Sequence, residues 1–112
     1  LAALQALEVT AAPGTDLAAA PAHLEGNWPN PFNPQTVIGF RLDRDAPVSL
    51  HVHDVAGRLV RRLATDEGLA AGRHERRWDG RDEAGREAPS GVSLVRLAAS
   101  GTVQTGRLTL VR

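Results

Sequence analysis

Hydrophobic and polar residues alternate along most of the chain after residue 26. In the clearest stretch, Ile38, Phe40 and Leu42 share one face, and the residues between them fall on the other. Such alternation is typical of a half-buried β-strand. The same pattern predicts strands near 36–42, 47–54, 58–64, 73–78, 92–99 and 103–111. Because no segment keeps a helical period, we predict an all-β fold, an antiparallel β-sandwich of about seven strands.

Turn residues separate these strands. Ala56 and Gly57 form a tight turn, in which Gly57 supplies a positive φ. Two further turns follow Trp78, which we expect to end a strand and to cap the core at one rim of the sandwich. The chain shows no convincing internal repeat.

A proline-rich lead-in precedes the first predicted strand. Prolines at positions 29, 31 and 34 forbid a helix and bias the residue before each of them toward extended or turn geometry. Upstream, residues 1–23 are rich in alanine and weakly patterned. We interpret them as a linker or the tail of a preceding domain, with a disordered tail as the alternative, and residues 24–112 as one domain.

Composition removes several function classes. The formal net charge is zero and there is no cysteine, so the chain offers no basic footprint for nucleic acid, no disulfide and no thiolate metal site. No apolar stretch approaches the roughly 18 residues that a membrane span needs. All thirteen basic residues are arginine, which a GC-rich genome explains most simply. Because the chain begins with Leu1, we interpret it as the C-terminal piece of a longer polypeptide.

Three clusters could carry metal or catalytic chemistry. Asp79, Asp82 and Glu83 could suggest calcium, although their spacing does not match a calcium loop and arginines lie among them. His51 and His53 share a strand face and could bind zinc, with His74 as a possible third ligand. Serines 49, 90, 93 and 100 lie outside any nucleophile elbow, and no phosphate-binding loop is present. We therefore expect no enzyme activity, no cofactor and no metal.

The arginine pairs at 61–62 and 76–77 are expected on solvated faces, where Glu75 can pair with one of them.

Five blocks, in order from about residue 24 to the last, resemble the type A C-terminal sorting domains of the type IX secretion system. The first is the lead-in Pro29, Asn30, Pro31, Phe32, Asn33 and Pro34, followed by a Thr-x-Ile-x-Phe strand. The middle blocks supply a turn and rim motif of Asp54, Gly57, Arg58, Trp78, Asp79, Gly80, Gly85 and Gly91. The last is a basic and apolar terminal strand. The immunoglobulin-like domain of the flagellar hook-capping protein shares the pattern. This chain has Arg76 where the family places a β-branched apolar residue.

The resemblance implies an immunoglobulin-like sandwich that acts as a sorting signal rather than as a catalyst. It implies an N-terminal cargo domain in the same precursor, recognition by outer-membrane secretion machinery, and cleavage by a sortase-like protease. The protein would pass through the periplasm of a Gram-negative bacterium and be secreted or held at the cell surface. Two alternatives stay open. One is a structural immunoglobulin-like module, and the other is a carbohydrate-binding accessory module, which would need an exposed aromatic pair such as Trp28 and Trp78.

The terminal strand suggests how a receptor could recognise such a sorting signal. A strand at a sheet edge offers unpaired backbone groups and can be recognised by strand addition. The candidate recognition residues are Arg107, Leu108, Leu110 and Arg112, of which the arginines could contact carboxylates on a receptor.

Overall fold

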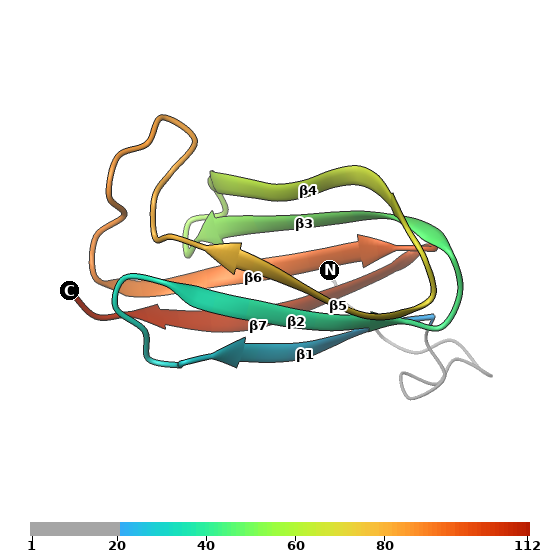
Figure 1. The fold of residues 1–112 in the computed structure, drawn as a ribbon. Coiled ribbons are helices and arrows are strands. Elements are labelled where there is room, and N and C mark those ends of the chain that lie inside the picture. The colour runs from blue at the N-terminus through green and yellow to red at the C-terminus, as the bar shows by residue number, and fades with distance from the viewer. Residues whose placement is uncertain (1–20) are drawn as a thin grey trace.

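Seven antiparallel strands form two packed sheets in the computed structural model, which describes residues 21–112. The strands are β1 (Ala22–Trp28), β2 (Thr36–Leu42), β3 (Ala46–Asp54), β4 (Leu59–Leu69), β5 (Gly72–Trp78), β6 (Gly91–Ala99) and β7 (Thr102–Leu110). One sheet has the order β1-β2-β5, and the other has the order β4-β3-β6-β7 (Figure 1). The predicted all-β sandwich is therefore confirmed. None of the described residues forms a helix long and apolar enough to cross a membrane.

The predicted strands agree with the observed ones, with one omission. The bounds of β2 match the prediction, and β4 runs five residues further, to Leu69. The sequence missed β1, and it placed Ala22 and His23 in the linker, although Ala22 is fully buried. The alternation in β1 is weak, and its register against β2 shifts at a bulge between Leu24 and Gly26. The remainder of the expected linker, residues 1–20, lies outside the described residues.

The core lies between the two sheets and is mostly aliphatic. Ile38, Phe40 and Leu42 point inward from β2, as the alternation predicted, and each is at most 2% exposed. The opposite sheet supplies Val48, Leu50, Val52, Val95, Leu97, Leu108 and Leu110. Burial of such side chains stabilises the fold by about 1.5–3 kcal/mol each. The two terminal apolar residues of β7 therefore belong to the core.

One end of the sandwich collects the segments that the sequence singled out. We call this the motif end: the lead-in 29–35, the 55–58 turn, the 79–90 loop and residues 111–112. Figure 1 shows them together, on the side where β3 and β5 finish and β4 and β6 begin. The antiparallel topology brings them to the same end because consecutive strands alternate in direction.

Candidate functional site

The lead-in docks onto the edge of β7 at the motif end. Phe32 donates its backbone N–H to the carbonyl of Thr109 and accepts the N–H of Val111, both at 2.9 Å. The Asn30 side-chain oxygen accepts the Thr109 N–H at 3.2 Å. This makes an isolated parallel bridge between Phe32 and Leu110. The proline-rich segment is thus a short piece of added strand as well as a stiff connection.

Phe32 is the one lead-in residue that enters the core. Its side chain is 2% exposed, while the five other residues of the predicted lead-in block are exposed. Its ring lies 5.5 Å from the ring of Trp78. Trp78 is fully buried at the end of β5, as expected, and its indole N–H donates to the carbonyl of Arg81. The aromatic pair closes the motif end of the core.

Two turns at the motif end have the same structure. In the 54–58 turn, an oxygen of Asp54 accepts the backbone N–H groups of Ala56 and Arg58, both at 2.9 Å, and its other oxygen accepts the Arg58 Nε–H. Gly57 has a φ of +88°, which confirms the prediction for that residue. In the 82–86 turn, an oxygen of Asp82 accepts two backbone N–H groups at the equivalent positions, also at 2.9 Å. We call these two segments the twin turns.

The sequence already carried the signal for this local repeat. Residues 54–58 and 82–86 both read Asp-x-Ala-Gly-Arg. The expectation that the chain has no internal repeat was therefore wrong at the scale of a single turn. Both turns line one surface groove with a volume of about 790 Å³, whose apolar lining comes from residues 55–56, 59–60, 88–89 and 92.

Backbone N–H donors lower the pKa values of three carboxylates at and beside these turns. The pKa of Asp54 is lowered, chiefly by the Arg58 backbone N–H, and that of Asp82 is lowered, chiefly by the Arg86 backbone N–H. The Arg62 backbone N–H likewise lowers the pKa of Glu83. Each carboxylate is held in its ionised form by the fold, which suits a structural role.

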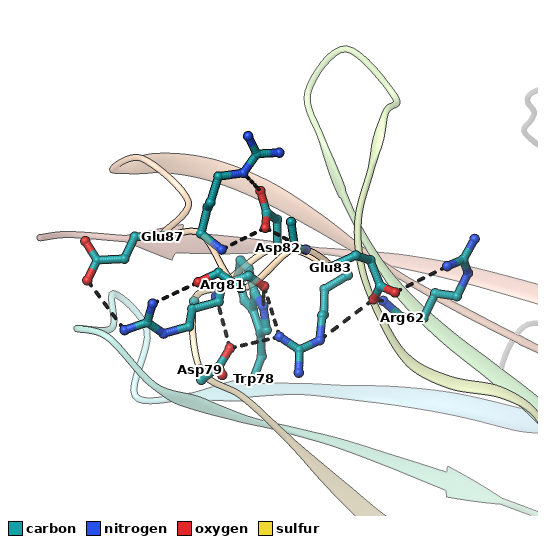
Figure 2. Close-up of polar contacts among 12 residues, drawn as sticks. Arg62, Trp78, Asp79, Arg81, Asp82, Glu83 and Glu87 are labelled. Atoms are coloured by element: carbon teal, nitrogen blue, oxygen red, sulfur yellow. Dashed lines mark hydrogen bonds and ion pairs between the residues drawn. The ribbon is translucent and has the colours of Figure 1, made fainter.

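The 79–90 loop is fastened to the outer edge of β4. The Glu83 N–H donates to the carbonyl of Val60 at 2.9 Å, and the Glu83 carboxylate accepts the Arg62 N–H at 2.7 Å. Arg61 reaches Asp79 at 3.3 Å and Glu83 at 3.8 Å. Figure 2 shows Glu83 turned toward Arg62, with Arg81 turned toward Glu87 on the other side of the loop. The loop therefore protects the start of an edge strand.

The second predicted arginine pair behaves differently. Arg76 is half-buried on the inward face of β5, and its guanidinium reaches Glu67 on β4 at 2.6 Å. The expected solvated face is thus wrong for Arg76. Arg77 is exposed and donates to Gln35. Glu75 pairs with Arg73 rather than with either arginine of the pair.

The four candidate recognition residues of β7 have different environments. Leu108 and Leu110 are 0% and 2% exposed, so a receptor that meets the folded domain cannot touch their side chains. Arg107 is exposed. Arg112 donates to the carbonyls of Ala88 at 2.7 Å and Gly80 at 2.8 Å, and its backbone N–H donates to Ser90. Arg112 therefore fastens the chain end to the 79–90 loop.

The possible metal ligands are occupied or dispersed. Asp79, Asp82 and Glu83 bond to arginines and backbone N–H groups, as described above. The His51 and His53 rings lie 6.3 Å apart, whereas His74 lies in the other sheet and stacks on Phe40. Burial, followed by the charge of Arg96, lowers the pKa of His53. Within residues 21–112, no three histidine or acidic side chains are grouped as metal ligands would be.

The two tryptophans do not form an exposed pair. Trp28 is 41% exposed and lies over Gly39, where a Cβ would come within 2.5 Å of its ring. The Arg73 guanidinium lies 5.2 Å from the centre of the Trp28 ring and is itself held by Glu25 at 2.9 Å. Trp78 is fully buried. The aromatic pair that a carbohydrate-binding module needs is therefore missing at these two positions.

A known family model matches this chain. The model of the FlgD Ig-like domain covers residues 27–103, which is more than half of the chain. The matched segment runs from the end of β1 through the lead-in and both twin turns to the start of β7. No curated protein matches the chain in sequence.

Solved structures share the fold over most of the chain. Part of the dimeric latent PorU from Porphyromonas gingivalis superposes with a TM-score of 0.63 at 22% identity, over 80% of this chain and 9% of PorU. PorZ, an essential bacterial surface component of the type-IX secretion system of the same species, gives a TM-score of 0.55 at 22% identity, over 77% of this chain and 11% of PorZ. The DNA glycosylase AlkC from Pseudomonas fluorescens gives 0.51 at 16% identity, over 83% of this chain and 31% of AlkC. These similarities show the fold alone.

Proposed function

We propose that this chain, which belongs to the FlgD Ig-like domain family, is a non-catalytic C-terminal sorting and anchoring domain. In this role it directs a larger exported protein through the outer membrane by type IX secretion. The observation that carries the proposal is the motif end. The blocks that resemble the sorting family are far apart in sequence, yet they meet at this end. The lead-in bonds to the last residues of β7, and Arg112 bonds to the 79–90 loop, which carries one of the twin turns.

Two of the three structural neighbours, PorU and PorZ, lend support to this role. PorZ is itself a surface component of a type IX system, and this chain superposes on part of it. The chain spans only about a tenth of PorU and PorZ, so it corresponds to one domain of such proteins. The proposed partners are an N-terminal cargo domain, the outer-membrane secretion machinery and a sortase-like protease. The proposed location is the cell surface or the medium, reached through the periplasm.

Export of a reporter tests the proposal directly. A periplasm-directed reporter fused to residues 1–112 is expressed in a bacterium with a working type IX system and in the same strain without its translocon. The matched control is the reporter without the domain. We expect surface or medium reporter only when both domain and translocon are present. A stable fusion that stays in the periplasm of the competent strain would contradict the proposal.

A structural immunoglobulin-like module is the second candidate, and the family match favours it. The family is described by its occurrence in FlgD, so its members are not all sorting signals. A structural module would remain in the mature protein and associate with other domains. Mass spectrometry of the mature surface protein separates the two functions, because a sorting domain that is cleaved leaves no peptides from residues 36–112.

A further inference from the structure

Part of the outer edge of β7 has no backbone partner among the described residues. In an antiparallel pair, successive residues point their N–H and C=O groups alternately toward and away from the neighbouring strand. Since Thr109 bonds outward to the lead-in, the outward positions of β7 are 103, 105, 107 and 109. The lead-in occupies position 109, and β7 pairs only with β6 along the rest of its length. We call Val103–Arg107 the open window.

The open window is accessible and able to pair. Val103, Thr105 and Arg107 are all exposed, and the exposed fraction of Val103 is 58%. The same edge already accepts an extended segment, because Phe32 forms a parallel bridge with Leu110. Edge strands with free N–H and C=O groups accept a further strand from another chain.

Charge indicates which strand fits. Arg107 makes no ion pair within residues 21–112, and the window contains no acidic side chain. Arg96, on the neighbouring strand opposite Thr105, also has no acidic partner there. An added strand that places a carboxylate beside Arg107 would gain a cross-strand ion pair.

The inward side of the window is crowded by β1, since the side-chain oxygen of Gln104 accepts the Leu24 N–H at 2.6 Å. At Gly106, a Cβ would come within 2.9 Å of a Leu24 methyl carbon and 3.4 Å of a Val95 methyl carbon. An added strand therefore favours small side chains on its inward face, while the side chains on its solvent-facing side lie beside Arg107.

We propose that the open window binds an extended segment of a partner protein by strand addition, with an acidic side chain placed beside Arg107. The inference deepens the proposed sorting function, since it names the stretch of β7 that a receptor would pair with. It moves the recognition surface from the terminal residues, which are buried or bonded to the lead-in and the 79–90 loop, to the middle of the strand. A second copy of this chain is a poorer occupant because its own window carries no carboxylate.

Binding of two synthetic peptides to the purified 112-residue chain tests the proposal. Both are extended octapeptides that alternate valine with a charged residue, glutamate in one and lysine in the other. We expect the glutamate peptide to bind at least about fivefold tighter at low salt. Amide chemical-shift changes should concentrate on Val103, Thr105 and Arg107. Equal binding of both peptides, or shift changes confined to another surface, would overturn the proposal.

Three variants separate the backbone and the charge contributions. Thr105→Pro removes an outward N–H without breaking a bond to β6, so it should abolish peptide binding while a melting curve still shows a folded protein. Arg107→Glu should reverse the preference toward the lysine peptide. Arg41→Glu makes the same charge change on the exposed face of the other sheet, and it should leave the preference unchanged.

Two further outcomes count against the proposal. Unchanged binding by Thr105→Pro would show that the peptide does not add as a strand. A dimer of the wild-type chain in analytical ultracentrifugation, lost in Thr105→Pro, would assign the window to a second copy. Because these measurements use no secretion machinery, their failure is distinguishable from failure of the sorting function, which only the export experiment reports.

Discussion

The ring of Phe32 packs against the ring of Trp78, with centroids 5.5 Å apart and an interplanar angle of 57°. The contact joins the proline-rich lead-in to the end of β5. Both side chains are at most 2% exposed, and Phe40 is the other large aromatic residue buried in the core. Since the chain has only 4% aromatic residues, this pair carries an unusual share of the packing at the motif end.

Phe32→Ala should therefore lower the free energy of unfolding by about 3–5 kcal/mol, the typical cost of removing a buried phenylalanine. The expected loss includes the cavity left beside Trp78. Urea unfolding followed by tryptophan fluorescence measures it. Trp28→Ala is the matched control, since Trp28 is 41% exposed and its loss should cost much less. Equal losses for the two variants would contradict a core role for Phe32.

Much of the fold could be predicted because alternation is a local signal. The clean pattern of Ile38, Phe40 and Leu42 predicted the bounds of β2, and Gly57 predicted its turn. β1 was missed because its alternation is weak and its register against β2 shifts at a bulge between Leu24 and Gly26. Its strand conformation therefore depends more on pairing with β2 than on its own residues. The inward position of Arg76 was missed because its partner, Glu67, lies on another strand.

The site was less accessible to sequence reasoning. The resemblance singled out the lead-in and the terminal strand separately, and nothing local shows that Phe32 pairs with Leu110 across 78 positions. Likewise, Arg112 reads as a free charge in the sequence, while in the structure two loop carbonyls bind it. Long-range hydrogen bonds of this kind leave no periodic signal. The twin turns are the exception, because their shared pentapeptide is visible in the sequence.

The twin turns predict a specific acid sensitivity. The pKa values of Asp54 and Asp82 are lowered from the ordinary 3.8, so their stabilisation is fully present above the unfolded-state pKa. It is lost as the pH falls through the lower folded-state values. The double variant Asp54→Asn with Asp82→Asn should melt below the wild type at neutral pH. The gap between the two melting temperatures should shrink below about pH 4.

Calorimetry over a series of pH values checks this expectation. Asp66→Asn is the control, because Asp66 is exposed, its side chain makes no hydrogen bond within residues 21–112, and asparagine tolerates its φ of +47°. That variant should follow the wild-type melting curve at every pH. If the difference in melting temperature between the wild type and the double variant stayed constant down to acid pH, the pKa values of the two carboxylates would not differ between the folded and unfolded states.

Arg112→Ala should lower the free energy of unfolding by about 1–3 kcal/mol, because the Ala88 carbonyl loses its guanidinium donor and the Gly80 carbonyl keeps only the Ala88 N–H. Arg112→Lys should recover only part of the loss, since an ammonium group lacks the planar fork that reaches both carbonyls. Arg107→Ala is the matched control and should stay within about 0.5 kcal/mol of the wild type. Chemical denaturation of the three variants gives the comparison. A loss for Arg107→Ala equal to that for Arg112→Ala would contradict a special role for the chain end.

The contribution of Arg112 to stability also affects how a deletion of residues 108–112 can be interpreted. Deleting residues 108–112 removes Leu108 and Leu110 from the core together with the Arg112 contacts. Loss of export after that deletion would follow from unfolding alone. Only variants of the exposed Arg107 and Thr105 separate recognition by the secretion machinery from stability.

At Gly80 the 79–90 loop lies close against the lead-in. Its φ is +77°, and a Cβ would lie 2.7 Å from the carbonyl oxygen of Pro34 and 3.0 Å from the Arg112 guanidinium. Gly57 is the matched control, because it has a similar φ of +88° with nothing within 4 Å. Both alanine variants incur the cost of a left-handed conformation, about 1–3 kcal/mol. Gly80→Ala adds a collision with backbone, so it should lose about 1–2 kcal/mol more than Gly57→Ala in urea unfolding. Equal losses would mean that Pro34 moves aside freely, and that the lead-in is not fixed against the 79–90 loop.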